Sequence, residues 1–129
     1  MKHDERLLVN LSAYVNADER LCWRGRHVDT EFLIEVDRDQ YLISIKNGRI
    51  DSVRKDAFAQ SEWRFALRAS SDAWTAFWQP RPVPGYHDIM AMLKFKNLKM
   101  EGDLYPLMSH LLYFKDVLVS VRAMEGQDE

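Results

Sequence analysis

The sequence predicts an α+β fold in which a mostly antiparallel sheet carries helices on one face. Two kinds of periodicity predict it, because apolar residues recur at helical spacing near both ends and alternate with polar residues in between. A third observation is the pair Asn47-Gly48, since a two-residue hairpin turn needs positive φ at both positions. Alternating strands bury one face and leave the other to solvent, so we expect helices to cover a single face.

The first half is predicted to hold an opening helix and several strands. A helical stripe of Leu7, Leu8, Leu11, Tyr14 and Val15 predicts a helix over 5–16. Strands are expected at 21–28, 31–36, 41–46, 49–53 and 62–69. In the last of these, the clearest of the five, Trp63 and Phe65 are expected to share one face.

The second half is predicted to hold three helices and one strand. Ser70-Ser71-Asp72 supplies N-cap side chains to a short helix that ends before the proline-rich loop 79–86. Ile89, Met92 and Leu93 mark the next helix, and Leu98, Met100 and Gly102 mark a last strand. Asp103 is expected to cap one final helix, whose apolar stripe is Leu104, Leu107, Met108, Leu111, Leu118 and Val121.

Composition indicates one folded domain over 1–129. Eighteen Lys and Arg residues against 20 Asp and Glu give a formal net charge of −2, so a general nucleic-acid-binding surface is not indicated. The single Cys22 excludes an internal disulfide and a cysteine-based zinc site. The N-terminus is charged, and no apolar run approaches the ~18 residues of a membrane span. We therefore expect a soluble cytoplasmic protein without stable membrane insertion.

Motifs for catalysis are not found. The four histidines, His3, His27, His87 and His110, lie in separate predicted elements without metal-ligand spacing, so neither a metal nor another cofactor is expected. Cys22 and His27 would point to opposite faces of one strand, which argues against a nucleophile and its base. The basic cluster Lys94, Lys96 and Lys99 is compatible with a nucleic-acid or phosphate site, but we favour the interpretation that these lysines complement the dipole at the end of a helix. Four arginines are expected on the solvent-facing side of the sheet, where they form a mild docking patch: Arg24, Arg26, Arg64 and Arg68.

The chain is rich in large adaptable apolar side chains. It has six Met, four Trp, five Tyr and six Phe residues, and many of them fall in the second half. Methionine and aromatic side chains fill irregular cores, and they also line pockets that accept varied apolar guests. Composition alone does not separate the two interpretations.

The order of these parts resembles the sterol carrier protein type 2 domain, the SCP-2-like lipid-binding family. The clearest piece is 98–104, Leu-Lys-Met-Glu-Gly-Asp-Leu, which is similar to the family's hydrophobic-x-hydrophobic-x-Gly-Asp corner before its last helix. The resemblance implies a five-stranded sheet whose helices enclose an apolar cavity for sterols, fatty acids, acyl-CoA or other lipids. The chain departs from the eukaryotic carriers in lacking a peroxisomal C-terminus and in the insert 79–86, which we expect to cover or fill the cavity.

Three functions stay compatible with these observations. The first is a non-catalytic carrier for a hydrophobic small molecule (a lipid, fatty acyl or sterol-like ligand). Its cavity wall is expected to include Trp74, Phe77, Trp78, Met92, Leu93, Met100, Met108, Leu111 and Leu112. The second is an accessory module with a filled core, which acts as a homodimer or docks on an enzyme partner. The third is a small enzyme that uses a titratable residue in an apolar pocket, and its candidates are Asp88, His87, His110 and Glu101.

Overall fold

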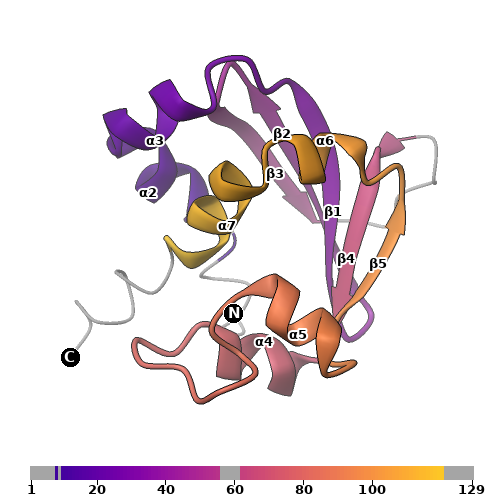
Figure 1. Ribbon diagram of the computed structural model, residues 1–129. Coiled ribbons are helices and arrows are strands. Elements are labelled where there is room, and N and C mark those ends of the chain that lie inside the picture. Colours follow the sequence, from indigo (N-terminus) through magenta and orange to yellow (C-terminus); the bar gives the residue numbers. More distant parts are fainter. Residues whose placement is uncertain (1–7, 9, 56–61, 121–129) are drawn as a thin grey trace.

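The computed structural model describes residue 8 and residues 10–55 and 62–120. A five-stranded sheet has helices on one face, as Figure 1 shows. The strands are β1 (Thr30–Val36), β2 (Asp39–Lys46), β3 (Arg49–Lys55), β4 (Phe65–Ala69) and β5 (Lys99–Gly102). The helices are α2 (Leu11–Ala17), α3 (Glu19–Arg24), α4 (Ser71–Phe77), α5 (Ile89–Lys94), α6 (Tyr105–Ser109) and α7 (Leu111–Val119). The predicted α+β class and the single helical layer are confirmed.

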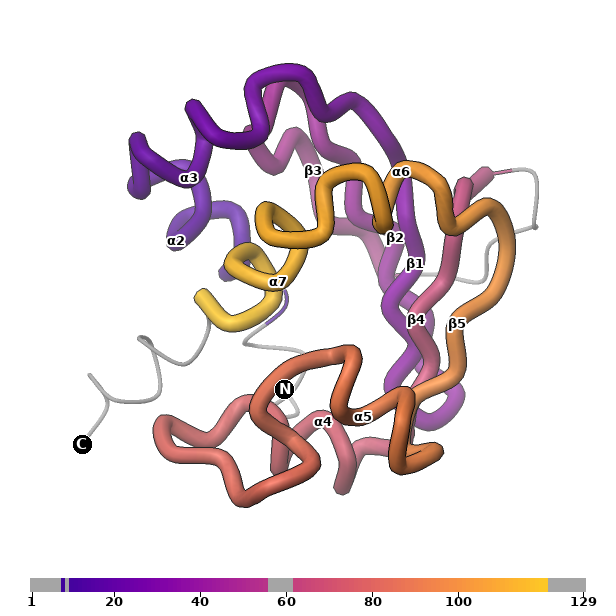
Figure 2. Tube along the Cα trace, in the orientation of Figure 1, coloured from indigo at the N-terminus to yellow at the C-terminus, as the bar shows by residue number. Residues whose placement is uncertain are grey.

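The strand order is β3-β2-β1-β4-β5, and only the central β1–β4 pair is parallel. Figure 2 shows the chain leaving the sheet after β4, passing through α4 and α5, and returning as β5 beside β4. The predicted hairpin lies between β2 and β3, with φ of 53° at Asn47 and 79° at Gly48. A Cβ atom at Gly48 would lie 2.4 Å from the carbonyl oxygen of Cys22, so this tip fits closely under the end of α3.

The prediction of a strand over 21–28 is wrong, because most of this segment is helix α3 and the turn that follows it. Asp18 caps the helix by accepting a hydrogen bond from the Leu21 N–H at 3.1 Å. The buried positions Leu21, Cys22 and Gly25 have helical spacing, although the alternation of apolar and polar residues suggested a strand. Cys22 is buried and donates its thiol to the Val15 carbonyl at 3.3 Å, and the exposed His27 lies in the turn.

The final helix is also not continuous. It is divided at His110, whose φ of −129° and ψ of 39° separate α6 from α7. The break shifts the register of the apolar stripe, so Leu107 and Leu118 are buried while Met108 is 42% exposed. Val121, the last member of the predicted stripe, lies outside the described residues.

Both faces of the sheet bury apolar side chains, whereas the alternation of apolar and polar residues predicts one buried face and one solvent-facing face. The face under the helices carries the main core, which includes Phe32, Ile34, Phe65 and Leu67. On the opposite face, a second buried cluster consists of Leu33, Leu42, Ala66 and Trp63. Trp63 does not share a face with Phe65 because β4 begins only at Phe65, and the preceding chain turns away.

The predicted patch of four arginines is not formed on the sheet. Arg24 belongs to α3, where it pairs with Asp116 of α7, and Arg26 lies in the following turn, over the ring of Trp23. Arg68 does lie on the solvent-facing side, where it pairs with Glu35 and Glu101. The four side chains therefore stabilise separate local contacts.

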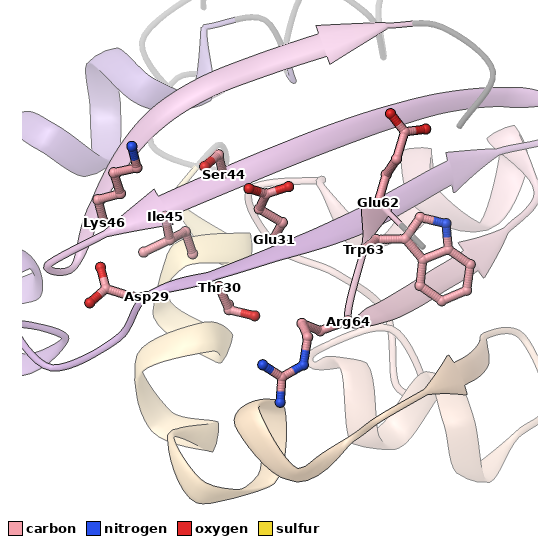
Figure 3. Close-up of a pocket in the computed structure, with 9 residues that line it drawn as sticks. All are labelled: Asp29, Thr30, Glu31, Ser44, Ile45, Lys46, Glu62, Trp63 and Arg64. Carbon is pink, nitrogen blue, oxygen red and sulfur yellow. The ribbon is translucent and has the colours of Figure 1, made fainter. Parts of the chain in front are cut away.

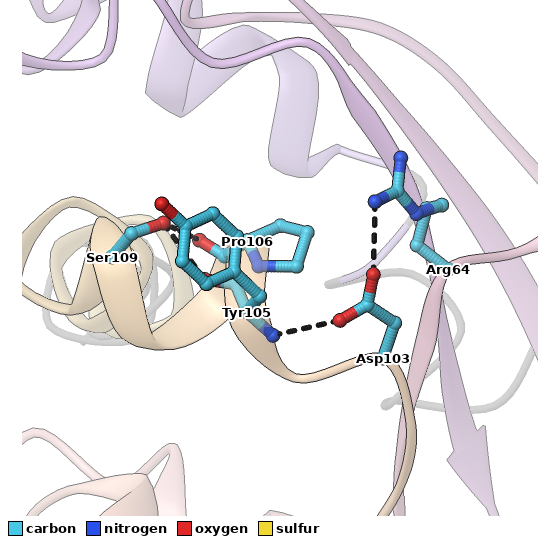
Figure 4. Close-up of polar contacts among 5 residues, drawn as sticks. All are labelled: Arg64, Asp103, Tyr105, Pro106 and Ser109. Carbon is cyan, nitrogen blue, oxygen red and sulfur yellow. Dashed lines mark hydrogen bonds and ion pairs between the residues drawn. The ribbon is translucent and has the colours of Figure 1, made fainter.

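The predicted corner at Gly102-Asp103 forms, but the N-cap position of α6 is Leu104 and not Asp103, whose contacts Figure 4 shows. Gly102 has φ of 89°, and a Cβ atom there would lie 2.5 Å from the Arg64 carbonyl oxygen. The Asp103 carboxylate accepts the Tyr105 N–H at 3.1 Å and pairs with the Arg64 guanidinium at 2.9 Å. These contacts turn the chain from β5 into α6, and the Arg64 hydrogen bond lowers the pKa of Asp103.

The outer edge of the sheet at β3 lies against α2. The side chain of Asn16 donates from Nδ2 to the Ile50 carbonyl at 3.0 Å and accepts the Ile50 N–H on Oδ1 at 2.8 Å. One side-chain amide therefore occupies both backbone hydrogen-bonding groups of an edge residue.

Candidate ligand-binding site

A pocket of about 620 Å³ opens where α4 begins, α5 ends and β4 lies beside β5. We call it the α4–α5 pocket. The described residues that line it are Arg68, Ala69, Ser70, Ala73, Leu93, Lys96, Asn97, Leu98, Lys99 and Met100. Leu93 and Met100 are two of the wall residues that the sequence predicts.

The apolar floor of this pocket continues into the aromatic side of α4. Ser70 caps α4 by accepting the Ala73 N–H at 3.1 Å, which fixes the start of the helix beside the pocket. Trp74, which follows Ala73 in α4, is fully buried and stacks on Trp78 with ring centroids 5.1 Å apart. Phe77 meets Trp74 edge-on at 5.7 Å. A methionine- and aromatic-rich interior therefore lies directly behind the pocket.

Two indole hydrogen bonds hold α4 in place. Trp74 Nε1 donates to the Glu35 carbonyl of β1 at 2.9 Å, and Trp78 Nε1 donates to the Leu118 carbonyl of α7 at 3.2 Å. Because both rings are almost completely buried, these bonds satisfy donors that would otherwise be costly to bury.

The charged residues among the described lining are Arg68, Lys96 and Lys99, and two of them are neutralised by neighbouring carboxylates. Arg68 is already paired with Glu35 and Glu101, and Lys99 lies 2.9 Å from Glu101. Burial acts to lower the pKa of Arg68, but its contacts with the two glutamates outweigh this and raise it. Lys96 forms no ion pair with any residue in the described part of the chain.

Lys96 also has an unusual backbone. Its φ is 64°, in the left-handed region that glycine or asparagine usually occupies just after a helix. The Lys96 N–H reaches the Leu93 carbonyl at 3.1 Å, and the Asn97 N–H reaches the Met92 carbonyl at 2.8 Å, which closes α5. A side chain in this conformation costs roughly 1–2 kcal/mol relative to the right-handed region. The position thus keeps a lysine at the pocket despite a local conformational cost.

The predicted wall residues fall into two groups. Trp74, Phe77, Trp78 and Met92 are buried in α4 and α5, near the pocket-lining Leu93 and Met100. The other three belong to α6 and α7, where Leu111 is half-buried and Met108 and Leu112 are 42% and 70% exposed. Met108 and Leu112 are not among the described residues that line the pocket.

The titratable candidates of the enzyme hypothesis have other surroundings. Asp88 caps α5 by accepting the Ala91 N–H at 2.9 Å, and it pairs with Lys115 of α7 at 3.3 Å. Burial acts to raise the pKa of Asp88, but the Ala91 hydrogen bond and the Lys115 ammonium outweigh it and lower the pKa. His87 is exposed beside Asp88, His110 lies at the helix break, and Glu101 pairs with Arg68 and Lys99. None of the four is among the described residues that line the α4–α5 pocket.

A second pocket of about 480 Å³ lies at the other end of the sheet (Figure 3). Three carboxylates, of Asp29, Glu31 and Glu62, share it with Lys46 and Arg64. It holds none of the predicted wall residues, and its mixed charges favour no one ligand class. The α4–α5 pocket contains two of the predicted wall residues, Leu93 and Met100, and is the better candidate.

Among the residues that the structure describes, no group of three or more His, Cys, Asp or Glu side chains is arranged to hold a metal ion. No helix there has the length and apolar character needed to cross a membrane.

Comparison with known proteins identifies the fold. No protein-family model matches the sequence, and no curated protein sequence does. A crystal structure of sterol carrier protein 2 matches with a TM-score of 0.72 and 11% identity, over 91% of this chain and 94% of that one. A UbiJ-SCP2 ubiquinone synthesis protein matches with a TM-score of 0.58 and 11% identity, over 95% and 97%. Palmitated SCP2L2 from Aedes aegypti matches with a TM-score of 0.54 and 16% identity, over 85% and 90%. The chain therefore has the sterol carrier protein 2 fold, as the sequence resemblance predicts.

Proposed function

We propose that this sterol carrier protein 2 fold serves here as a non-catalytic carrier for a hydrophobic small molecule. The observation that carries the proposal is the α4–α5 pocket, whose floor of Leu93, Leu98 and Met100 is backed by the buried aromatic side of α4. Its volume of about 620 Å³ falls within the roughly 300–1,000 Å³ of small-molecule sites.

The composition of the interior supports the same conclusion. Met92 is buried in α5, and Met90 and Met100 are half-buried against the core, so flexible thioether side chains and the aromatic rings of α4 belong to one apolar cluster. Such side chains repack around a guest at little cost in strain. Apolar burial at about 25 cal/mol per Å² would supply the driving force. The proteins named above as sterol carriers, and the palmitated SCP2L2, offer precedents for a lipid as the cargo.

The first test identifies what the protein retains. Native mass spectrometry of the freshly purified chain, followed by organic extraction, is expected to show a co-purified lipid. Titration with palmitate and with 1-hexadecanol then measures affinity for one acyl chain with two head groups. Binding of neither compound, together with an extract free of lipid, would contradict a carrier of this kind.

A matched pair of variants locates the site. Leu93→Trp fills the α4–α5 pocket and is expected to weaken binding about tenfold, since a bulkier side chain occupies the space of the guest. Leu112→Trp makes the same change at an exposed position on α7 and is expected to leave binding unchanged. Equal affinity in the two variants would exclude this pocket as the site. Thermal unfolding of both variants checks that each is folded.

A further inference from the structure

We infer that β5 is a self-association edge, at which a second copy of this chain adds its own β5 in antiparallel orientation. The two five-stranded sheets then form one continuous sheet. Because the two-fold axis of such a pair is perpendicular to the sheet, both helical layers lie on the same side of it. The inference does not depend on the proposed carrier function.

The first argument is the backbone hydrogen bonding of β5. It is an outer strand, and β4 is its one strand neighbour in the described part of the chain (Figure 1). The Asp103 N–H donates to the Arg64 carbonyl at 2.7 Å, so residues 64 and 103 form a hydrogen-bonded pair that continues the antiparallel ladder. Such pairs alternate with non-hydrogen-bonded ones, so Met100 and Gly102 direct their N–H and C=O groups away from β4. A row of outward groups of this kind can accept another strand.

The two edges of the sheet differ in this respect. At the β3 edge, the Asn16 side chain occupies both backbone hydrogen-bonding groups of Ile50. At the β5 edge, no side chain among the described residues bonds to the outward groups of Met100 or Gly102. The β5 edge is therefore the more open of the two.

The second argument is the order of charges along this edge, which selects a second copy as the partner. Lys96 and Lys99 precede Met100, and Glu101 and Asp103 follow it. Parallel pairing of two copies would place like charges side by side, which destabilises a strand pair. Antiparallel pairing centred on Met100 instead places Lys99 of each copy opposite Glu101 of the other.

The side chains of this charged set lie on one face. Lys99 and Glu101 are paired in register with Arg68 and Ala66 of β4, on the side of the sheet away from the helices. Within one copy, Lys99 Nζ lies 2.9 Å from a Glu101 carboxylate oxygen. The two lysines and two glutamates of the paired edges therefore form a closed set of alternating charges. The edge is complementary in charge to itself.

The third argument is exposed apolar surface at both ends of β5. Phe95, which ends α5 before the strand, is 59% exposed, and Tyr105, which begins α6 after it, is 75% exposed. Because antiparallel pairing reverses one copy, Tyr105 of one copy and Phe95 of the other lie at the same end of the joined edge. Contact between the two rings removes apolar surface from water and adds to the backbone hydrogen bonds.

Sedimentation equilibrium of the full chain measures the association. The contact is small, so we expect a reversible dimer with a Kd of about 10–100 µM. Raising NaCl to about 0.5 M is expected to weaken the dimer severalfold, because exposed charges are screened by salt. A chain that stays monomeric at about 0.5 mM would overturn the inference.

Two charge reversals locate the interface. Lys99→Glu and Glu101→Lys each create two like-charge pairs in the dimer, so each variant alone is expected to self-associate about tenfold more weakly than wild type. An equimolar mixture of the two has opposite charges at every paired position, and it is expected to form a heterodimer about as tightly as wild type dimerises. Lys46→Glu makes the same reversal on β2, away from this edge, and is expected to leave the association unchanged.

A second matched pair tests the backbone of the edge. Met100→Pro removes an N–H that points away from β4, so the chain keeps its own ladder while the dimer loses the two hydrogen bonds at its axis. This variant is expected to associate about tenfold more weakly. Met100→Leu keeps the N–H and is expected to dimerise as wild type does. Thermal unfolding of every variant checks that it is folded.

The heterodimer keeps the inference testable even if the proline variant fails to fold. If Lys99→Glu and Glu101→Lys each dimerise at wild-type strength, the contact lies elsewhere and the inference is wrong. A mixture that associates no more tightly than the separate variants would show that these charges do not face each other, which also overturns it. Wild-type dimerisation of a folded Met100→Pro chain would exclude pairing through this strand.

Discussion

The helical layer consists of two groups that meet the sheet in different ways. Helices α2, α3, α6 and α7 form one group, and α4 and α5 form the other, which lies apart from the first in Figure 2. In the first group, an aromatic ring packs directly against the backbone of a glycine. The ring of Tyr113 lies against Gly25, and its hydroxyl donates to the Gly48 carbonyl at 2.7 Å. Burial, with Cys22 as a smaller cause, raises the pKa of Tyr113, which keeps this donor protonated.

The second group is joined to the rest of the fold by two indole hydrogen bonds and one ion pair, which reach different elements. Its indoles bond to β1 and α7, Asp88 pairs with Lys115 of α7, and the proline-rich segment 79–86 connects its two helices. The α4–α5 pocket lies in this group. If the α4–α5 pocket binds the proposed ligand, stability and binding would depend on different parts of one small core, and the following variants test that separation.

The largest expected effect comes from Phe114→Ala. Phe114 is fully buried and meets the rings of Phe32, Phe65 and Tyr113 at 5.4–5.6 Å. Its truncation is expected to lower the free energy of unfolding by about 3–5 kcal/mol, with unchanged ligand affinity in the folded protein. Phe77→Ala is the matched change in the other group and is expected to weaken binding as well. Denaturant unfolding and ligand titration measure both effects, and equal losses of affinity would remove the distinction between the groups.

Gly25→Ala is expected to have the next largest effect. A Cβ atom at residue 25 would lie 2.2 Å from Tyr113 Cε1, so the ring or α3 must move. Overpacking of this kind costs about 1–3 kcal/mol, measurable as a lower midpoint of denaturant unfolding. The same substitution in a Tyr113→Leu background is expected to cost less. Additive losses would show that the tyrosine ring is not the obstacle.

Trp78→Phe tests the connection between the two groups. It removes the hydrogen bond from Nε1 to the Leu118 carbonyl and keeps most of the buried ring surface. We expect a loss of about 1 kcal/mol and faster amide exchange in α4 and α5 than in α7. Uniformly faster exchange over both groups would indicate that they open as one unit.

Asp88→Asn is expected to have the smallest effect, and that effect depends on pH. Asparagine retains the N-cap of α5 but loses the charge that pairs with Lys115. Because the pKa of Asp88 is lowered in the folded state, its charge stabilises the fold above the unfolded pKa of about 4. That stabilisation is lost as pH falls through the folded pKa. Wild type and variant should therefore differ by about 0.5–1 kcal/mol at pH 7, and the difference should shrink as the pH falls through the folded pKa. A difference that does not depend on pH would contradict this assignment.

Local patterns predicted much of the fold, and they failed where the chain leaves a regular repeat. Alternation located β1, β2 and β4, and the Asn47-Gly48 turn fixed the hairpin because its chemistry is local. The segment 21–28 fits both a strand and a helix by composition, and the Asp18 cap and the packing of Gly25 on Tyr113 select the helix. The parallel pairing of β1 with β4 depends on contacts between distant segments, which no local pattern contains.

Part of the candidate site was predictable because it also depends on a local pattern. Helical spacing placed Trp74, Phe77 and Met92 in a buried region, since their faces follow from the local repeat. The sequence placed Lys96 in a basic cluster at a helix end, but its left-handed φ and its place beside the pocket are properties of the folded chain. Met108 and Leu112 were assigned to the wall by extending one helix through His110, where the structure has two.

The side chain of Asn16 has a consequence for contacts between molecules. An edge strand with free N–H and C=O groups is a template for strands of other chains. Through its two bonds with Ile50, the amide occupies one donor and one acceptor at the outer edge of β3, and it ties helix α2 to that edge. These two backbone groups are therefore not available for pairing with a strand of another molecule.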